Sequence, residues 1–323
     1  MSETANTAAL AEVVSNDIFK WLKWETCAAR DIDWDCTSSE HDKATHPSDV
    51  VFYYGDPYSG QTIYVNTDLK SYKQSSITTS SVKSALKSLA MTIDCALTNA
   101  NWQNNFINCE NWEVIGLLFT FNYDGSYQKD FMSLLDKISL ESLGIKRDQR
   151  IAVFGPETIN YLINMVDDLR KAVQDRKKTD ETSYDFYYPN MVDNKKHSLD
   201  FYSATIELIL SPFMIIRFNG NNDKDYIIYY RETGDTTEEF IYLIDTLLTY
   251  QILNLENNIE VVLYNPKNDS KAMVNFDSAK ASYAKSWGLS ANDERFQSIT
   301  TRVMNRKQNY FDPLNERISN EQN

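Results

Sequence analysis

The chain lacks the segments that would place it in a membrane or export it. Its longest apolar runs, residues 114–121 and 208–218, are too short and too interrupted by polar residues to cross a bilayer. Residues 1–11 have no basic region followed by an apolar stretch, which a secretory signal needs. We therefore expect no membrane association and a cytoplasmic location.

Cysteine and histidine are scarce. The cysteines are Cys27, Cys36, Cys95 and Cys109, and the histidines are His41, His46 and His197. No two cysteines form a CxxC pair, and four are too few for a disulfide framework in a chain of this length. A zinc site would have to be assembled from scattered residues. We therefore predict reduced core cysteines, no zinc site, and a surface position for His46.

Nucleotide-binding and hydrolase signatures are also missing. The sequence has no GK[ST] loop, no GxGxxG motif and no Ser/His/Asp arrangement. These absences exclude the common ATPase and dinucleotide-binding sites. No internal repeat is evident in the sequence.

Basic residues are outnumbered, with 32 Lys and Arg against 46 Asp and Glu, for a net charge of −14. Nucleic-acid binding normally rests on a basic surface. Basic residues do gather locally, at Lys70, Lys73, Lys83 and Lys87, at residues 170–178, and at Arg302, Arg306 and Lys307. A partner subunit could supply further positive charge, so we expect a homo-oligomer or a protein partner.

The length and the apolar content are those of a folded protein with more than one core. With 323 residues, 42% of them apolar, the chain is expected to form two domains. A charged tract at 175–182 is the best boundary. The predicted organisation is a disordered start (1–14), a first domain (15–178), a smaller α+β accessory domain (183–290) that binds substrate or a partner, and a polar tail (291–323).

Hydrophobic spacing predicts an α-β-β-β-α-β order in the first domain. The elements are a helix from Ser15 through Leu22, strands at 31–37, 49–54 and 62–70, a helix at 80–100 and a buried strand at 114–121. A helix at 129–140, a strand at 151–154 and a helix at 156–176 follow. The second domain is predicted as a small α+β sandwich, with helices at 197–210, 237–253 and 277–287 and strands at 213–218, 226–231 and 259–264.

Two short motifs frame the second and third predicted strands: Pro47-Ser48-Asp49 and Asp68-Leu69-Lys70. Because side chains alternate along a strand, Asp68 and Lys70 share a face. If Tyr54 lies opposite Gln61 across the turn, Asp49 falls opposite Asn66 on that same face. A slip of one residue would move Asp49 to the other face.

These motifs, in this order of elements, resemble the PD-(D/E)xK, or restriction-endonuclease-like, nuclease superfamily, over residues 15–121. Ser48 departs from the superfamily pattern by separating proline from aspartate. The resemblance implies an α/β fold with a mixed sheet, in which Asp49 and Asp68 hold Mg²⁺ or Mn²⁺. Lys70 would position or activate the attacking water and stabilise charge on the phosphorus.

Glu25 is predicted as a further catalytic and metal-binding residue. It follows Ile18 and Leu22 at helical spacing, so it is expected to point toward the sheet, where a lone buried carboxylate is costly. Several members of the superfamily carry a glutamate on this first helix as an extra ligand.

Two functions remain open. The first is a metal-dependent endonuclease that cuts DNA in preference to RNA, and the resemblance suggests an effector of bacterial defence against phage. The second is a non-catalytic, nuclease-like scaffold that acts in a complex. Asp49, Asp68 and Lys70 favour the first, and the charge of −14 favours the second.

Overall fold

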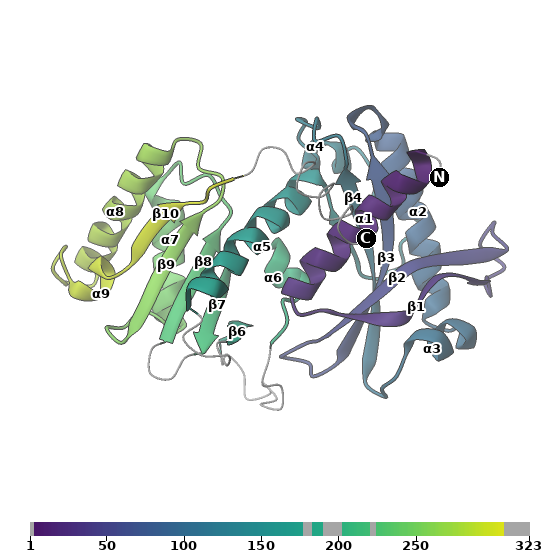
Figure 1. The fold of residues 1–323 in the computed structure, drawn as a ribbon, viewed down its shortest axis with the longest axis horizontal. Coiled ribbons are helices and arrows are strands. Elements are labelled where there is room, and N and C mark those ends of the chain that lie inside the picture. Colours follow the sequence, from purple (N-terminus) through teal and green to yellow (C-terminus); the bar gives the residue numbers. More distant parts are fainter. Residues whose placement is uncertain (1–2, 177–182, 190–201, 220–223, 307–323) are drawn as a thin grey trace. The chain divides into compact units, whose positions relative to one another are not determined.

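The computed structural model describes residues 3–176, 183–189, 202–219 and 224–306 (Figure 1). The chain forms two compact units, Met1–Ile163 and Asn164–Arg306, which divide within one helix. Each unit contains one five-stranded sheet. Among the described helices, none has both the length and the apolar character needed to cross a membrane.

The first unit is built on a mixed sheet. Its strands lie in the order β1-β2-β3-β4-β5, with β1 to β3 antiparallel and β3 to β5 parallel. Its elements are α1 (Glu3–Trp21), β1 (Glu25–Asp35), β2 (Thr45–Gly55), β3 (Thr62–Tyr72), η1 (Gln74–Ser76), α2 (Thr79–Ala96), α3 (Ala100–Phe106), β4 (Trp112–Asn122), α4 (Met132–Leu135), η2 (Leu140–Leu143), β5 (Ile151–Phe154) and α5 (Pro156–Arg176). The predicted α-β-β-β-α-β order and the mixed α/β class are confirmed.

Different helices cover the two faces of this sheet. Phe19 of α1 contacts Phe52 and Phe119, so α1 covers the face that carries these rings. Val51 and Tyr64 lie on the opposite face and join the apolar cluster built around α2. The first helix and the helix after the hairpin therefore lie on opposite sides of the strands (Figure 1).

The helix α2 packs closely against the sheet. It begins with a capping box, in which the Thr78 hydroxyl accepts from Ser81 N–H and the Ser81 hydroxyl accepts from Thr78 N–H. On the facing strand, a Cβ at Gly116 would lie 3.1 Å from side-chain atoms of both Leu89 and Ile93. The absence of a side chain at Gly116 thus lets α2 approach β4.

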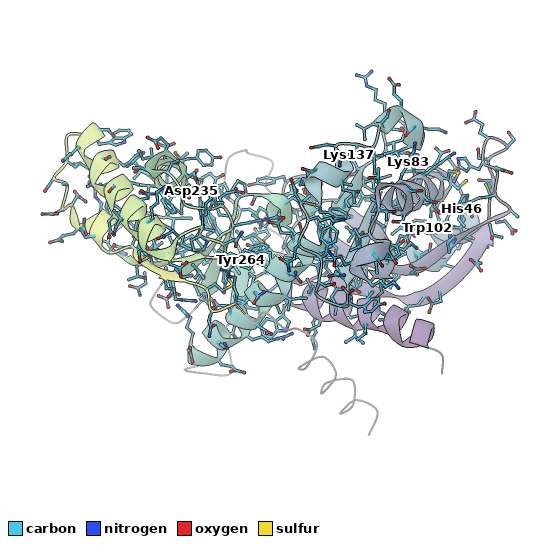
Figure 2. All side chains as sticks on the ribbon, turned by 90° about the horizontal axis from the view of Figure 1, so that it is seen from above. His46, Lys83, Trp102, Lys137, Asp235 and Tyr264 are labelled. Carbon is cyan, nitrogen blue, oxygen red and sulfur yellow. The ribbon has the colours of Figure 1, made fainter. Side chains whose placement is uncertain are left out.

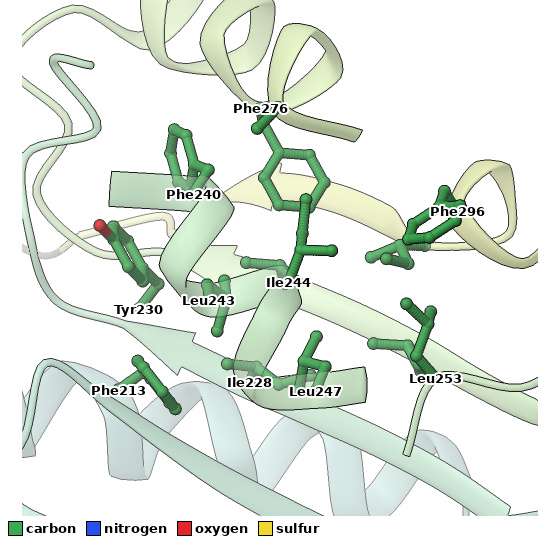
Figure 3. Packing of buried hydrophobic residues seen from close by; sticks show 14 of the residues in the cluster. Phe213, Ile228, Tyr230, Phe240, Leu243, Ile244, Leu247, Leu253, Phe276 and Phe296 are labelled. Carbon is green, nitrogen blue, oxygen red and sulfur yellow. The ribbon is translucent and has the colours of Figure 1, made fainter. Parts of the chain in front are cut away.

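The second unit has its own core under a second mixed sheet, with strand order β10-β9-β8-β7-β6. Its elements are β6 (Ser183–Phe186), α6 (Ile206–Leu210), β7 (Phe213–Asn219), β8 (Lys224–Tyr230), α7 (Thr237–Thr249), β9 (Asn257–Leu263), α8 (Asp269–Ser286), α9 (Glu294–Gln297) and β10 (Thr300–Val303). Phe240 of α7 meets Phe276 of α8 edge to face and also contacts Tyr230 of β8 (Figure 3).

The second sheet repeats the topology of the first. Its first three strands, β6 to β8, are antiparallel, and its last three, β8 to β10, are parallel. The helix α7 connects the parallel strands β8 and β9, as α2 connects β3 and β4. The short helix α6, between β6 and β7, has no counterpart in the first unit. The two units therefore share a topology, although the sequence shows no internal repeat.

Three predictions about less regular parts of the chain are wrong. Residues 3–14, expected to be disordered, form part of α1 because apolar side chains at Leu10 and Val14 continue its buried stripe. The stretch after residue 290, expected to be a tail, contributes α9 and the parallel strand β10. Residues 129–140 hold the short α4 and the start of η2 instead of one helix. Of the helix predicted at 197–210, residues 197–201 lie outside the described residues.

Candidate active site

The candidate site lies where two paired strands separate. Strands β2 and β3 are paired from Gly55–Thr62 to Val50–Thr67. Beyond that point β2 continues along β1, and β3 continues along β4. We call this separation the fork; it is formed by residues 47–49 of β2 and 68–70 of β3. The two sequence motifs therefore face each other across the fork.

The observed register differs from the predicted one by two residues. Asp56 closes the turn, because its N–H donates to the Gln61 carbonyl at 2.9 Å and its carboxylate accepts from the N–H groups of Tyr58 and Ser59. Asn66 therefore pairs with Val51 instead of with Asp49. A shift of two residues preserves the face to which side chains point, so the placement of Asp49 beside Asp68 survives the error.

The Asp49 carboxylate is held by the backbone of the neighbouring strand. Its Oδ2 accepts a hydrogen bond from Leu69 N–H at 2.9 Å. Burial raises the pKa of the Asp49 carboxyl; the Leu69 hydrogen bond lowers this pKa, the Asp68 charge raises it, and the net shift is upward. Two carboxylates are thus held near each other in a partly desolvated place.

Lys70 is paired with Asp68. The Lys70 ammonium donates a hydrogen bond to Asp68 Oδ1, with the lysine side chain 33% exposed and the aspartate side chain 17% exposed. Burial alone would lower the pKa of Lys70, but the Asp68 charge and hydrogen bond, together with the Asp49 charge, raise it above its ordinary value. The ammonium is therefore a protonated donor at neutral pH.

These side chains share one hollow with the helix α2. Its lining comes from Pro47 and Asp49 of β2, Asn66, Thr67, Asp68 and Lys70 of β3, and Ser88, Leu89 and Thr92 of α2. The α2 residues carry no sequence signature of their own, and only the packing of α2 against β4 brings them here. Sequence reasoning missed them for that reason.

Ser48 anchors the fork. Its hydroxyl donates to Asn66 Oδ1 at 2.6 Å and accepts from the indole N–H of Trp34 at 3.1 Å. The indole of Trp102 (labelled in Figure 2) lies 3.3 Å from both the Ser48 hydroxyl and Asn66 Oδ1. All four residues are buried. The residue that departs from the superfamily pattern therefore satisfies a buried polar network next to Asp49.

The prediction for Glu25 is wrong in its structural basis. The helix α1 ends at Trp21, the chain reverses at Lys23 with a positive φ, and Trp24 stacks on Phe19. Glu25 is instead the first residue of β1, is exposed, and accepts from the Tyr53 hydroxyl at 2.6 Å. It is not among the residues that line the hollow. The prediction fails because Glu25 lies beyond the end of α1 at Trp21, where helical spacing no longer applies.

The remaining site residues fit a divalent cation. Asp49 and Asp68 offer carboxylate oxygens, which Mg²⁺ and Mn²⁺ prefer, and burial together with the Asp68 charge raises the pKa of Asp49 and so disfavours its charged form. A bound cation would favour that charged form.

Comparison with protein families matches residues 1–158 to the GAPS4 protein PD-(D/E)XK nuclease domain. Over these residues the chain is similar to a nuclease domain of the PD-(D/E)XK superfamily. No curated protein and no solved structure matches the chain. The match covers the whole sheet of the first unit, including the fork and α2.

The second unit does not reproduce the nuclease fork. The pairing of β7 with β8 ends, on the side away from the turn, at Phe213 and Tyr230. The next residues outward are Pro212 and Arg231. Arg231 N–H donates to the Pro212 carbonyl at 2.9 Å, so the backbone pairing continues where it opens in the first unit. The positions that correspond to Asp49 and Asp68 thus carry no carboxylate.

Proposed function

We propose that the first unit is an endonuclease that uses Mg²⁺ or Mn²⁺ to hydrolyse phosphodiester bonds, with DNA preferred to RNA. The observation that carries the proposal is the convergence of Asp49, Asp68 and Lys70 on one hollow, within a segment that matches a nuclease-domain family model.

Each residue has a defined part in this reaction. Asp49 and Asp68 would hold the cation, with Asp49 kept in place by the Leu69 N–H. The cation supplies charge for the phosphate oxygens and a more acidic water. Lys70, protonated beside Asp68, can donate to the phosphate or to the attacking water. Water adds to phosphorus, and the P–O bond on the opposite side breaks.

The biological role that we propose is defence against phage. It follows from the matched family and from the resemblance to free-standing bacterial nucleases of this kind. The second unit, which has the strand arrangement without the carboxylates, would bind substrate or a protein partner. We propose that the protein acts as a homo-oligomer or in a complex.

The net charge of −14 favours a second candidate, a non-catalytic scaffold with a nuclease-like fold. In that case the fork would serve only to support a docking surface. The two candidates differ in whether the carboxylates and the lysine are needed for cleavage.

The test uses the full-length protein with plasmid, single-stranded DNA and RNA, each with Mg²⁺, Mn²⁺ or EDTA. We expect cleavage that needs the metal, and a loss of about 10²-fold or more in Asp68→Asn and Lys70→Gln. Asp136→Asn and Lys285→Gln, which change exposed residues that do not line the hollow, are the matched controls. Equal activity in all variants, or no cleavage by the wild type even with its partner present, overturns the catalytic proposal. Phage plating on cells that express wild type or Asp68→Asn tests the defence role.

A further inference from the structure

Beside the fork, the fold gathers four side chains that the sequence scatters. Cys36 follows β1, His41 lies in the loop after it, His46 is on β2 and Cys95 is on α2. One potential ligand atom from each residue lies within 4.8 Å of those from the other three. The fold therefore assembles residues that are scattered in the sequence.

The spacing of three of the four donor atoms is that of a tetrahedral site. Cys36 Sγ lies 3.7 Å from Cys95 Sγ, and His41 Nδ1 lies 3.5 Å and 3.4 Å from the two sulfur atoms. Tetrahedral zinc, with Zn–S of about 2.3 Å and Zn–N of about 2.0–2.1 Å, separates its ligands by about 3.8 Å for two sulfurs and about 3.5 Å for sulfur and nitrogen. The observed distances agree with these to within about 0.1 Å.

His46 supplies an independent observation. This residue, labelled in Figure 2, is fully buried, and its Nε2 finds no hydrogen-bond partner among the described residues. Its Nδ1 lies 3.4 Å from the Thr92 hydroxyl. A buried polar atom without a partner is costly, and metal coordination would satisfy it.

The histidines also have the outer contacts that metal-bound imidazoles use. His41 directs Nδ1 to the sulfur atoms, and its Nε2 lies 3.2 Å from Asp94 Oδ2. Asp94 is held in turn by Lys146 at 2.7 Å and by Gln149 at 3.3 Å. A carboxylate behind a histidine fixes the tautomer and orientation of a zinc-bound ring.

We propose that Cys36, His41, His46 and Cys95 bind one Zn²⁺ as a closed, structural Cys₂His₂ site. Zinc is the metal that suits two thiolates and two imidazoles, whereas the carboxylates at the fork suit Mg²⁺ or Mn²⁺. Binding displaces the thiol protons to solvent and involves no change of oxidation state.

The zinc site would fasten the free end of β2 to α2. His46 lies three residues before Asp49, and Thr92 both contacts His46 and lines the hollow at the fork. Beyond the last β2–β3 pair, this segment has only β1 as a strand partner. The zinc would therefore fix the segment that carries Asp49. Zinc binding at these four residues would not depend on whether the fork is catalytic.

The experiment measures zinc by elemental mass spectrometry in full-length protein from which any affinity tag has been removed. We expect about one zinc per chain. Cys36→Ser and Cys95→Ser should each reduce the zinc content by about tenfold or more. Cys27→Ser and Cys109→Ser, which change the cysteines outside the cluster, should retain it, as should Asp68→Asn.

Two measurements on the unmutated protein keep the test independent of variants that fail to fold. Replacement of the metal by Co²⁺ should produce the absorption of a tetrahedral cobalt–thiolate centre, and strong chelators should lower Tm, with recovery when zinc is added. No bound zinc after zinc reconstitution, equal zinc loss in Cys27→Ser and Cys36→Ser, or a Cys36–Cys95 disulfide in the intact mass would each overturn the proposal.

Discussion

The Asp49 carboxylate accepts a hydrogen bond of 2.9 Å from the backbone N–H of Leu69 on the neighbouring strand. The side chain thus takes the position of a backbone acceptor. In the second unit a backbone hydrogen bond follows the last strand pair, from Arg231 N–H to the Pro212 carbonyl. Beyond its own last pair, the first hairpin instead has a hydrogen bond from the backbone of Leu69 to a side chain. This arrangement brings an acidic group into the opening between the strands.

Asp49→Asn should stabilise the metal-free protein. The asparagine keeps an oxygen that accepts the hydrogen bond from Leu69 N–H. It also removes a negative charge that burial and the neighbouring Asp68 disfavour, as the raised pKa of Asp49 indicates. We expect a rise in Tm of a few degrees in EDTA, measured by calorimetry. Saturating Mg²⁺ should raise Tm in the wild type and not in the variant. A lower Tm for the variant in EDTA would show that the charge of Asp49 does not destabilise the metal-free protein.

Ser48→Ala should destabilise the first unit by about 1–3 kcal/mol, because the Trp34 and Trp102 indoles and Asn66 lose a buried partner. Urea unfolding measures the free energy, and hydrogen exchange should show faster opening of β2. Ser39→Ala, at an exposed position in the loop after β1, is the control and should be neutral. An equal effect of the two substitutions would contradict the anchoring role.

Glu25→Gln should leave cleavage within about twofold of the wild type. The Glu25 side chain is exposed and contacts the Tyr53 hydroxyl, away from the residues that line the hollow. Metal titration of the cleavage rate should give the same midpoint for both proteins. A rise in the Mg²⁺ requirement of tenfold or more would restore Glu25 as a ligand.

Arg302→Ala should destabilise the second unit by about 1–3 kcal/mol. The Arg302 guanidinium binds both Asp168 oxygens, at 2.9 and 2.7 Å, and joins β10 to α5. Lys267→Ala removes an exposed ion pair to Asp235 and should cost far less. Hydrogen exchange resolved by peptide separates the two units. Unchanged protection of β10 in Arg302→Ala would mean that this contact does not hold the strand.

The order of elements and the acidic pair could be predicted because both depend on local spacing. Alternation along β3 places Asp68 beside Lys70 whatever the turn does, and an error of two residues in register leaves Asp49 on the same side. Glu25 was misplaced because periodicity does not reveal where a helix ends. After the reversal at Lys23, Trp24 stacks on Phe19 and also on Tyr54 of β2, and the second contact exists only in the tertiary fold.

The Cys/His cluster could not be predicted from pairwise motifs. Cys36, His41 and His46 are evenly spaced as C-x₄-H-x₄-H, which is a weak signal on its own. The fourth residue, Cys95, is on α2, and its position depends on the close approach of that helix at Gly116. His46 was assigned to a surface loop, whereas the strand β2 begins at Thr45 and buries it.

The continuous pairing of β7 and β8 in the second unit limits how many strands of a DNA duplex one chain could cleave. On the proposed function, the described residues of one chain hold one centre able to break a phosphodiester bond, because Pro212 and Arg231 replace the acidic pair in the other sheet. The two strands of DNA run in opposite directions, so simultaneous scission of both needs two centres related by a twofold axis. A lone chain would nick, and a double-strand break would require a second chain or a second encounter.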